Sequence, residues 1–309
     1  MTSTEDYCPP EVVANTALHV GEHKVTQSYF DQITKPILAG IQLGIGAMFS
    51  LYMKAGGPDY ASTPFCNLLA SGVFPLGLIM ILFTGTELYT SDCGLASFAL
   101  IRRKVSMLKW LKTIVFAFFM NYLGCFLAAY FICYLTASFD SAPVLYGLFK
   151  TIYGKATMKW YVALLRGIGA NYLVNLAVWF FFSSKSAAGK ILGIWWPITA
   201  FCAVGMEHSI ANQFYFSLGA LYKDFALNFT GDYADKIAHY ASAFNWWDTQ
   251  YKNILPAAIG NFLGGFLFCS LHWFRLIYKK GDIRKIFSNT LGDEIPEIED
   301  VCESIEVQV

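Results

Sequence analysis

The sequence predicts an all-α membrane protein of six transmembrane helices, two of them broken, arranged as an inverted repeat of three helices and three. Three observations carry this prediction: an apolar composition, six apolar segments and an internal repeat. Of the 309 residues, 56% are apolar and 14% are charged, and the mean hydropathy is +0.45. Soluble domains carry about 25% charged residues, so lipid is the expected solvent for much of this chain. The net charge is zero, so we expect no nucleic-acid partner.

Four segments are long and apolar enough to cross a bilayer, which takes about 20 residues. They cover roughly residues 37–53, 114–135, 162–182 and 254–277. Two further spans are interrupted by polar residues. One covers 65–83 and resumes at 93–101, and the other covers 191–204 and resumes at 210–222. We expect both to be broken helices.

The distribution of basic residues predicts the orientation of the chain. The loops and tails assigned to the cytoplasm carry about twice as many Lys and Arg residues as those on the opposite side. Both termini are then cytoplasmic, as an even number of spans requires. We expect a cytoplasmic N-terminal tail at residues 1–34, a six-span domain at 35–280 and an acidic cytoplasmic C-terminal tail at 281–309. The first 30 residues hold no apolar signal segment, so the plasma membrane is the expected location.

The two halves of the chain repeat each other. Gly85-Thr-Glu87 stands 120 residues before Gly205-Met-Glu207, and residues 121–127 recur at 261–267 with five of seven positions identical. Lys35, just before the first span, stands 120 residues before Lys155, just before the fourth. Because each half has an odd number of spans, the halves must be inverted in the bilayer. Substrate sites in such proteins form near the midplane, where broken helices face each other.

The two breaks predict a path for a small anion. Unpaired backbone groups are costly in hydrocarbon, so unwound backbone survives there only where it is buried or lines a cavity. The N-terminus of a half-helix offers free N–H groups and a partial positive charge, which favour an anion. His208 lies in the second break, and an ionisable side chain at this depth is functional by default. We expect Glu87 and Glu207 to support the breaks by accepting hydrogen bonds from backbone N–H groups.

No cofactor and no metal site are expected. Most of the eight cysteines lie in apolar runs without CxxC spacing, which indicates packing residues. The carboxylates and the one mid-span histidine supply neither a metal-ligand cluster nor a nucleophile with its base, which argues against an enzyme. A purely structural membrane protein would need no polar residues at paired helix breaks.

From about Lys35 to Lys280, the chain resembles the formate–nitrite transporter family, and its N-terminal tail favours a eukaryotic member. The resemblance is carried by Thr84-Gly-Thr-Glu-Leu-Tyr-Thr90, Gly205-Met-Glu-His-Ser-Ile-Ala-Asn212 and Gly260-Asn-Phe-Leu-Gly-Gly265. It implies an aquaporin-like fold and a homopentamer with one pore through each protomer.

The resemblance also implies roles for individual residues. His208 is the central histidine of the pore, and Lys35 and Lys155 are the inner and outer vestibule lysines that attract anions. The remaining pore residues form two apolar constrictions, the loop of the first break and polar positions beside the pore: Phe74, Leu78, Phe201, Leu88, Val174, Tyr89, Thr90, Asn171 and Asn212.

Several positions depart from the family pattern. The family usually has Asp at Glu87 and Phe at Tyr89, and it often has a carboxylate at Val162. The missing carboxylate at Val162 and the added Arg166 bear on the outer vestibule and on which anion is preferred.

The expected function is transport of small monovalent weak-acid anions, with formate first and lactate, nitrite, acetate and hydrosulfide as alternatives. A charged ion pays a large desolvation cost in a narrow apolar passage, whereas a neutral acid pays little. The hypothesis is therefore that the anion takes up a proton, from water or from His208, and crosses as the acid. The competing hypothesis is an anion channel in which His208 stays charged. An aquaporin-like pore for neutral solutes is the remaining alternative.

Overall fold

In the computed structural model, residues 6–55 and 62–276 are described, and most of them are helical. The helices of the first half are α1 (Pro10–Thr26), α2 (Tyr29–Lys54), α4 (Thr63–Val73), α5 (Leu76–Phe83), α6 (Tyr89–Ile101), α7 (Met107–Leu127) and the π-helix η1 (Ala128–Tyr134). Those of the second half are α8 (Ala142–Ala156), α9 (Trp160–Ser183), α10 (Ala187–Ala203), α11 (Ser209–Leu227), α12 (Ala234–Ser242), α13 (Trp246–Thr249), the π-helix η2 (Gln250–Ile254) and α14 (Leu255–Leu276).

The six predicted spans and the two breaks are confirmed. Helices α2, α7, α9 and α14 are the four continuous spans. Helices α4 and α5 end before an unwound loop and α6 follows it, and α10 and α11 flank the second loop in the same way. Helix α10 is apolar but too short to cross a bilayer alone, as expected for half of a broken span.

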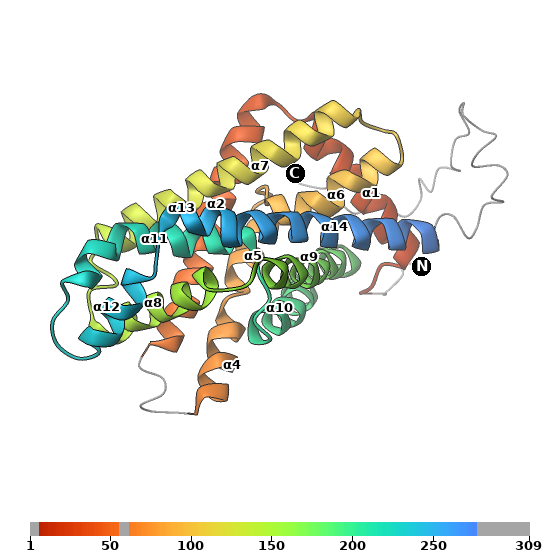
Figure 1. Ribbon diagram of the computed structural model, residues 1–309. Helices are drawn as coiled ribbons and strands as arrows, with labels where there is room; N and C mark the ends of the chain where they lie inside the picture. Colours follow the sequence, from red (N-terminus) through yellow and green to blue (C-terminus); the bar gives the residue numbers. More distant parts are fainter. Residues whose placement is uncertain (1–5, 56–61, 277–309) are drawn as a thin grey trace.

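The two halves are inverted with respect to each other. Helix α2 begins near α1 and reaches α8, whereas α9 begins after α8 and ends beside α1, where the Cys8 N–H donates to the Ser183 carbonyl at 2.7 Å. Figure 1 shows α1 and α6 at one end of the molecule and α8 and α12 at the other. We call these the α1 end and the α8 end.

Within each half, glycine allows the continuous helices to touch. Helix α2 packs along α7, and α9 packs along α14. A Cβ added at Gly124 would collide with the Ile37 carbonyl, and one added at Gly264 would collide with the Ile168 carbonyl. Small residues at such contacts let backbones approach closely where lipid gives no hydrophobic driving force.

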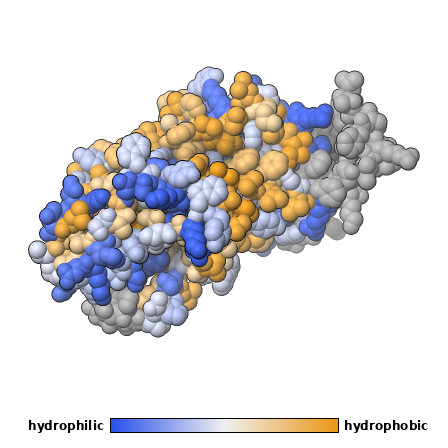
Figure 2. All heavy atoms as spheres, viewed as in Figure 1, coloured by the Kyte–Doolittle hydropathy of each residue, from blue (hydrophilic) through white to orange (hydrophobic). Residues whose placement is uncertain are grey.

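The surface matches that of a protein embedded in a bilayer. Figure 2 shows apolar side chains gathered over the middle of one face and hydrophilic ones concentrated over α8 and α12. Large apolar side chains are exposed along the spans, among them Phe119 on α7, Leu165 on α9, Trp196 on α10 and Leu267 on α14. Exposed apolar area on this scale is typical of lipid-facing helices.

Two features go beyond the sequence analysis. Residues 1–34, expected as a tail, contain α1 and the start of α2, and α1 packs against α6, where a Cβ at Gly21 would meet the Leu95 carbonyl. Helices α8 and α12 were not assigned either. The predicted acidic tail at 281–309 lies outside the described residues.

Candidate functional site

Both helix breaks have the same backbone geometry. Gly85 and Gly205 adopt φ of 66° and 71°, in the left-handed region that favours glycine. After each glycine the chain turns back onto the preceding helix: the Thr86 N–H donates to the Ile81 carbonyl at 3.1 Å, and the Met206 N–H donates to the Phe201 carbonyl at 3.0 Å. The 120-residue repeat seen in the sequence is therefore a repeat of structure.

An asparagine closes each break from the neighbouring continuous helix. The Asn121 Oδ1 accepts from the Tyr89 N–H at 2.8 Å, and its Nδ2 donates to the carbonyls of Pro36 at 2.8 Å and Glu87 at 2.9 Å. Asn261 does the same in the second half. Its Oδ1 accepts from the Ser209 N–H at 2.8 Å, and its Nδ2 donates to the carbonyls of Gly167 and Glu207, each at 2.9 Å. Each asparagine thus satisfies two backbone groups that the unwinding leaves free and bonds to a carbonyl of the neighbouring continuous helix, Pro36 of α2 or Gly167 of α9.

Replacing Asn121 by alanine is expected to destabilise the protein strongly. The side chain is fully buried, so the change leaves the Tyr89 N–H and the Glu87 carbonyl without their partner in a buried site. Each buried unpaired group costs about 1–3 kcal/mol. A thermal-unfolding assay in detergent should show a clear drop for Asn121→Ala. Asn228→Ala is the matched control, because that exposed asparagine side chain donates to the Asp224 carbonyl within its own helical turn. Equal stability of the two variants would contradict the bracing role.

His208 joins the two breaks. Its Nε2 lies 3.0 Å from the Thr90 Oγ1, and its Nδ1 accepts from the Ala211 N–H at 3.2 Å. Both side chains are buried, with 3% of His208 and none of Thr90 exposed. Because Nδ1 accepts a hydrogen bond, the imidazole is neutral with its hydrogen on Nε2, which donates to Thr90. The pair connects the N-termini of α6 and α11.

An apolar layer lies next to this pair. The rings of Phe74 and Phe201 meet edge to face with centroids 5.7 Å apart, and Phe201 stacks over the His208 imidazole at 6.0 Å. Leu78 belongs to the same buried cluster. The structure therefore brings together four of the residues expected at the pore: Phe74 after the end of α4, Thr90 of α6, Phe201 of α10 and His208 before α11.

On the α8 side, Lys155 meets Glu207. The Lys155 Nζ lies 2.9 Å from the Glu207 Oε1, and the Glu207 Oε2 accepts from the side-chain amides of Asn212 at 2.6 Å and Asn253 at 3.1 Å. We call these four residues the Lys155 cluster. One ammonium and one carboxylate make it neutral overall.

On the α1 side, the lysine is Lys24 rather than Lys35. The Lys24 Nζ contacts the Glu87 carboxylate and lies 3.0 Å from the Asp92 Oδ1, and all three side chains are buried. Burial alone would lower the pKa of Lys24, but the negative charges of Asp92 and Glu87 outweigh it and raise the pKa above its ordinary value. Lys24 is therefore charged. We call these three residues the Lys24 cluster.

Lys35 does not take part in this cluster. Its Nζ lies 3.4 Å from the Gln27 Oε1, partly exposed on α2. Lys35 is therefore not the structural counterpart of Lys155, because one offset of 120 residues does not hold over the whole repeat, and the attraction of anions by Lys35 stays a prediction. The Pro36 carbonyl accepts from Asn121, and the Gly167 carbonyl accepts from Asn261 in the same way. These two equivalent positions stand 131 residues apart. The same offset relates Lys24 to Lys155 and would have identified it.

The carboxylates of Glu87 and Glu207 bond to side chains at the breaks and not, as expected, to backbone N–H groups. Glu87 and Glu207 were expected to accept from backbone N–H groups, but their carboxylates pair with lysine and, in Glu207, with asparagine side chains. It is their backbone carbonyls that take part in the asparagine bracing.

The remaining predicted residues fall into two groups. Leu88 and Val174 are buried in the core, and the Asn171 Nδ2 donates to the Thr90 carbonyl at 2.9 Å and the Asn261 carbonyl at 2.5 Å. Tyr89 contacts α7 and α14. Its ring packs on Phe118 with centroids 5.1 Å apart, and its hydroxyl donates to the Ala258 carbonyl at 3.0 Å.

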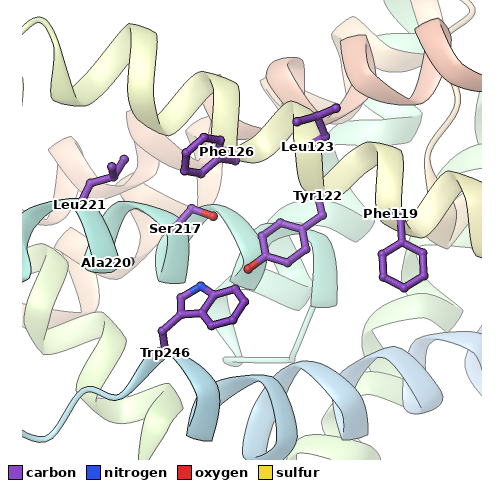
Figure 3. A pocket seen from close by; sticks show the side chains of 8 residues that line it. All are labelled: Phe119, Tyr122, Leu123, Phe126, Ser217, Ala220, Leu221 and Trp246. Carbon is purple, nitrogen blue, oxygen red and sulfur yellow. The ribbon is translucent and has the colours of Figure 1, made fainter.

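A separate groove of about 440 Å³ opens between α7, α11 and α13 (Figure 3). It is lined mainly by apolar side chains, including Phe119, Leu123 and Trp246. None of the residues predicted for the pore lines it, so it is distinct from the site at the breaks. Among the described residues no cluster of metal-ligand side chains occurs.

Comparison with known proteins assigns the family. Residues 11–274 match the formate/nitrite transporter family. The chain is 32% identical over 276 residues to an uncharacterized transporter of Bacillus subtilis, YrhG, covering 89% of this chain and 96% of that protein. It is 28% identical over 271 residues to the formate channel BtFdhC of Bacillus thuringiensis, covering 88% and 96%. The expected eukaryotic source stays a prediction, because these relatives are from Bacillus.

A solved structure agrees with this assignment. A pentameric formate channel with formate bound superimposes with a TM-score of 0.70 at 27% identity, over 81% of this chain and 97% of that chain. The chain is therefore an integral membrane protein of the formate/nitrite transporter family, a family of transporters and channels and not of enzymes.

Proposed function

We propose that the protein transports small monovalent weak-acid anions, formate first, each together with one proton. The observation that carries the proposal is a neutral His208 buried beside an apolar layer and flanked by two lysine clusters. Lactate, nitrite and acetate share the charge and small size that such a path accepts. The formate channel among the relatives and the formate-bound solved structure support formate as the first substrate.

The apolar layer favours a neutral permeant. Phe74 and Phe201 leave a charged formate without hydrogen-bond partners on one side of His208, and desolvating an ion without compensation is costly. The partial positive charges at the N-termini of α6 and α11 and the ammonium groups of Lys24 and Lys155 attract the anion up to this layer. Burial then disfavours its charged form, so the anion takes up a proton, crosses as the acid, and ionises on leaving.

The hydrogen bonds of His208 argue against the competing anion channel. A charged imidazolium carries a hydrogen on each ring nitrogen. In this structure that would place the Nδ1 hydrogen against the Ala211 N–H, which donates to the same nitrogen. The neutral imidazole fits the site, and it offers a hydrogen-bonding surface rather than a fixed counter-charge.

The proposal includes an oligomeric state and a cellular membrane. We propose a homopentamer with one path through each protomer, supported by the pentameric solved structure. We also propose the plasma membrane, with both termini cytoplasmic, on the distribution of basic residues.

Uptake of radiolabelled formate and lactate into liposomes containing the purified protein tests the proposal. With an acidic exterior we expect uptake of both acids to rise about tenfold for each unit of pH gradient, because the proton gradient adds about 1.4 kcal/mol. Clamping the membrane potential at different values should leave the rate unchanged. Uptake that follows the potential would establish the anion channel, and glycerol uptake without acid uptake would establish the neutral-solute pore.

A further inference from the structure

We propose that Glu87 and Asp92 share one bound proton in the Lys24 cluster, and that this proton makes transport sensitive to the pH at the α1 end in particular. The shared proton is a property of the resting protein. The pH sensitivity rests on the proposed function, because it is measured as transport of a weak acid.

The charges of the Lys24 cluster do not balance when both carboxyls are ionised. Two carboxylates face one ammonium: the Lys24 Nζ contacts Glu87 and lies 3.0 Å from the Asp92 Oδ1. The three residues are 7%, 4% and 0% exposed, in that order for Lys24, Glu87 and Asp92. The Asp92 Oδ2 is buried and has no hydrogen-bond partner in the described part of the chain. An unpaired carboxylate oxygen in such a place is unfavourable, and a hydrogen on one carboxyl removes the excess charge.

In the part of the chain that the structure describes, Lys24 is the cation that pairs with Glu87 and Asp92. The helices packed on α6 are α1, α7, α9 and α14. Apart from Lys24 on α1, the side chains that meet this part of α6 are neutral: Trp110 of α7 bonds to Ser97, Asn175 of α9 lies against Gly94, and Gly265 of α14 lies against Cys93. The Ser91 hydroxyl adds only a long hydrogen bond of 3.4 Å to the Asp92 Oδ1.

The other half of the repeat shows what a balanced cluster looks like. Position 92 corresponds to Asn212, 120 residues later, where the amide donates to the Glu207 Oε2 at 2.6 Å. The Lys155 cluster therefore holds one ammonium, one carboxylate and two amides. The substitution of a carboxyl for an amide at one end is what makes the two ends chemically different, although the backbone around them repeats.

The difference has a direct effect on an approaching anion. When the shared proton leaves, the Lys24 cluster becomes negative two residues from Thr90, which contacts His208. A negative cluster at the α1 end repels formate and cancels the attraction of Lys24. Acidifying the α1 side makes the cluster neutral again and so removes this repulsion, in addition to supplying the transported proton. The Lys155 cluster has no second carboxyl among its described members, so the α8 side should show only the effect of the transported proton.

Infrared spectroscopy of the purified protein tests the shared proton without transport. At neutral pH, the wild type should show the carbonyl stretch of a protonated carboxylic acid, and Asp92→Asn should lack it. Asp92→Asn makes the Lys24 cluster resemble the Lys155 cluster, so it is expected to fold. Asn212→Asp is the matched variant, because it places a second carboxyl beside Glu207 and should add a band of the same kind. A wild-type spectrum identical to that of Asp92→Asn would overturn the proposal.

Transport in vesicles of defined sidedness tests the pH response. Inside-out and right-side-out membrane vesicles expose opposite ends to the medium, so the pH at each end can be changed separately while formate uptake is followed. In the wild type, acidification at the α1 end should raise uptake about threefold more than acidification at the α8 end. Asp92→Asn should make the two responses equal. Equal responses in the wild type would overturn the pH part of the proposal, whereas absence of acid uptake from every variant would instead contradict the proposed function.

Discussion

Replacing His208 with alanine is expected to lower formate uptake at least tenfold. The change removes the ring that bonds to Thr90 and stacks on Phe201, and it leaves the Ala211 N–H without its acceptor. A tenfold loss corresponds to about 1.4 kcal/mol, which is the size of one such hydrogen bond in a buried site. The measurement is the initial rate of uptake into liposomes at a fixed pH gradient.

The alanine variant alone would not separate a role in transport from a role in folding, because His208 also caps α11. Asn and Asp side chains are good helix caps, since their oxygen accepts from the N–H of the second or third helical residue. His208→Asn therefore keeps an acceptor for the Ala211 N–H while removing the ring. We expect this variant to match the wild type in thermal stability and to lose uptake as the alanine variant does. Normal uptake by a stable His208→Asn protein would show that the ring has only a capping role.

The helix breaks were predictable from the sequence because their cause is local. Gly85 and Gly205 supply a backbone conformation that other residues adopt at a cost, and each stands in a polar stretch between apolar runs. The recurrence of Asn121 as Asn261 also has a local signal, although the sequence does not reveal that these side chains cap the broken helices. If both breaks lie at the same depth in the bilayer, Thr90 and His208 come close together, as they do in the structure.

The parts that were missed depend on contacts between distant segments. Helix α1 is polar enough to be taken for a tail, and only its packing on α6 shows that Lys24 reaches Glu87. Lys35 stands 120 residues before Lys155, which is the offset between the two helix breaks, and this spacing favours Lys35 over Lys24 in the sequence. Segments of different length between the repeated elements change that offset without changing the fold. A fixed offset of 120 residues therefore misses Lys24, which lies on α1 before the first span and stands 131 residues before Lys155. The contacts of Tyr89 with α7 and α14 also join distant segments, and the pore position expected for it stays a prediction.

Replacing Lys155 with methionine is expected to destabilise the protein by about 3–5 kcal/mol, which is the usual cost of removing one partner of a buried ion pair. Glu207 is only 2% exposed, and its Oε1 has Lys155 as its cation at 2.9 Å. The Lys252→Met variant is the control at the same end of the molecule. Lys252 pairs with Asp248 at 2.7 Å, but both side chains are more than half exposed, so the loss there should be within about 0.5 kcal/mol.

The double variant Lys155→Met with Glu207→Gln then separates the stability of the break from the capture of the anion. Removing both charges leaves a glutamine that can still accept from Asn212 and Asn253, so most of the lost stability should return. If Lys155 attracts the anion, the stable double variant should take up formate with a KM raised about tenfold and a nearly unchanged maximal rate, because only the charge that concentrates the substrate is gone. A double variant with wild-type KM would mean that Lys155 serves to neutralise Glu207, and that the N-termini of the broken helices attract the anion without it.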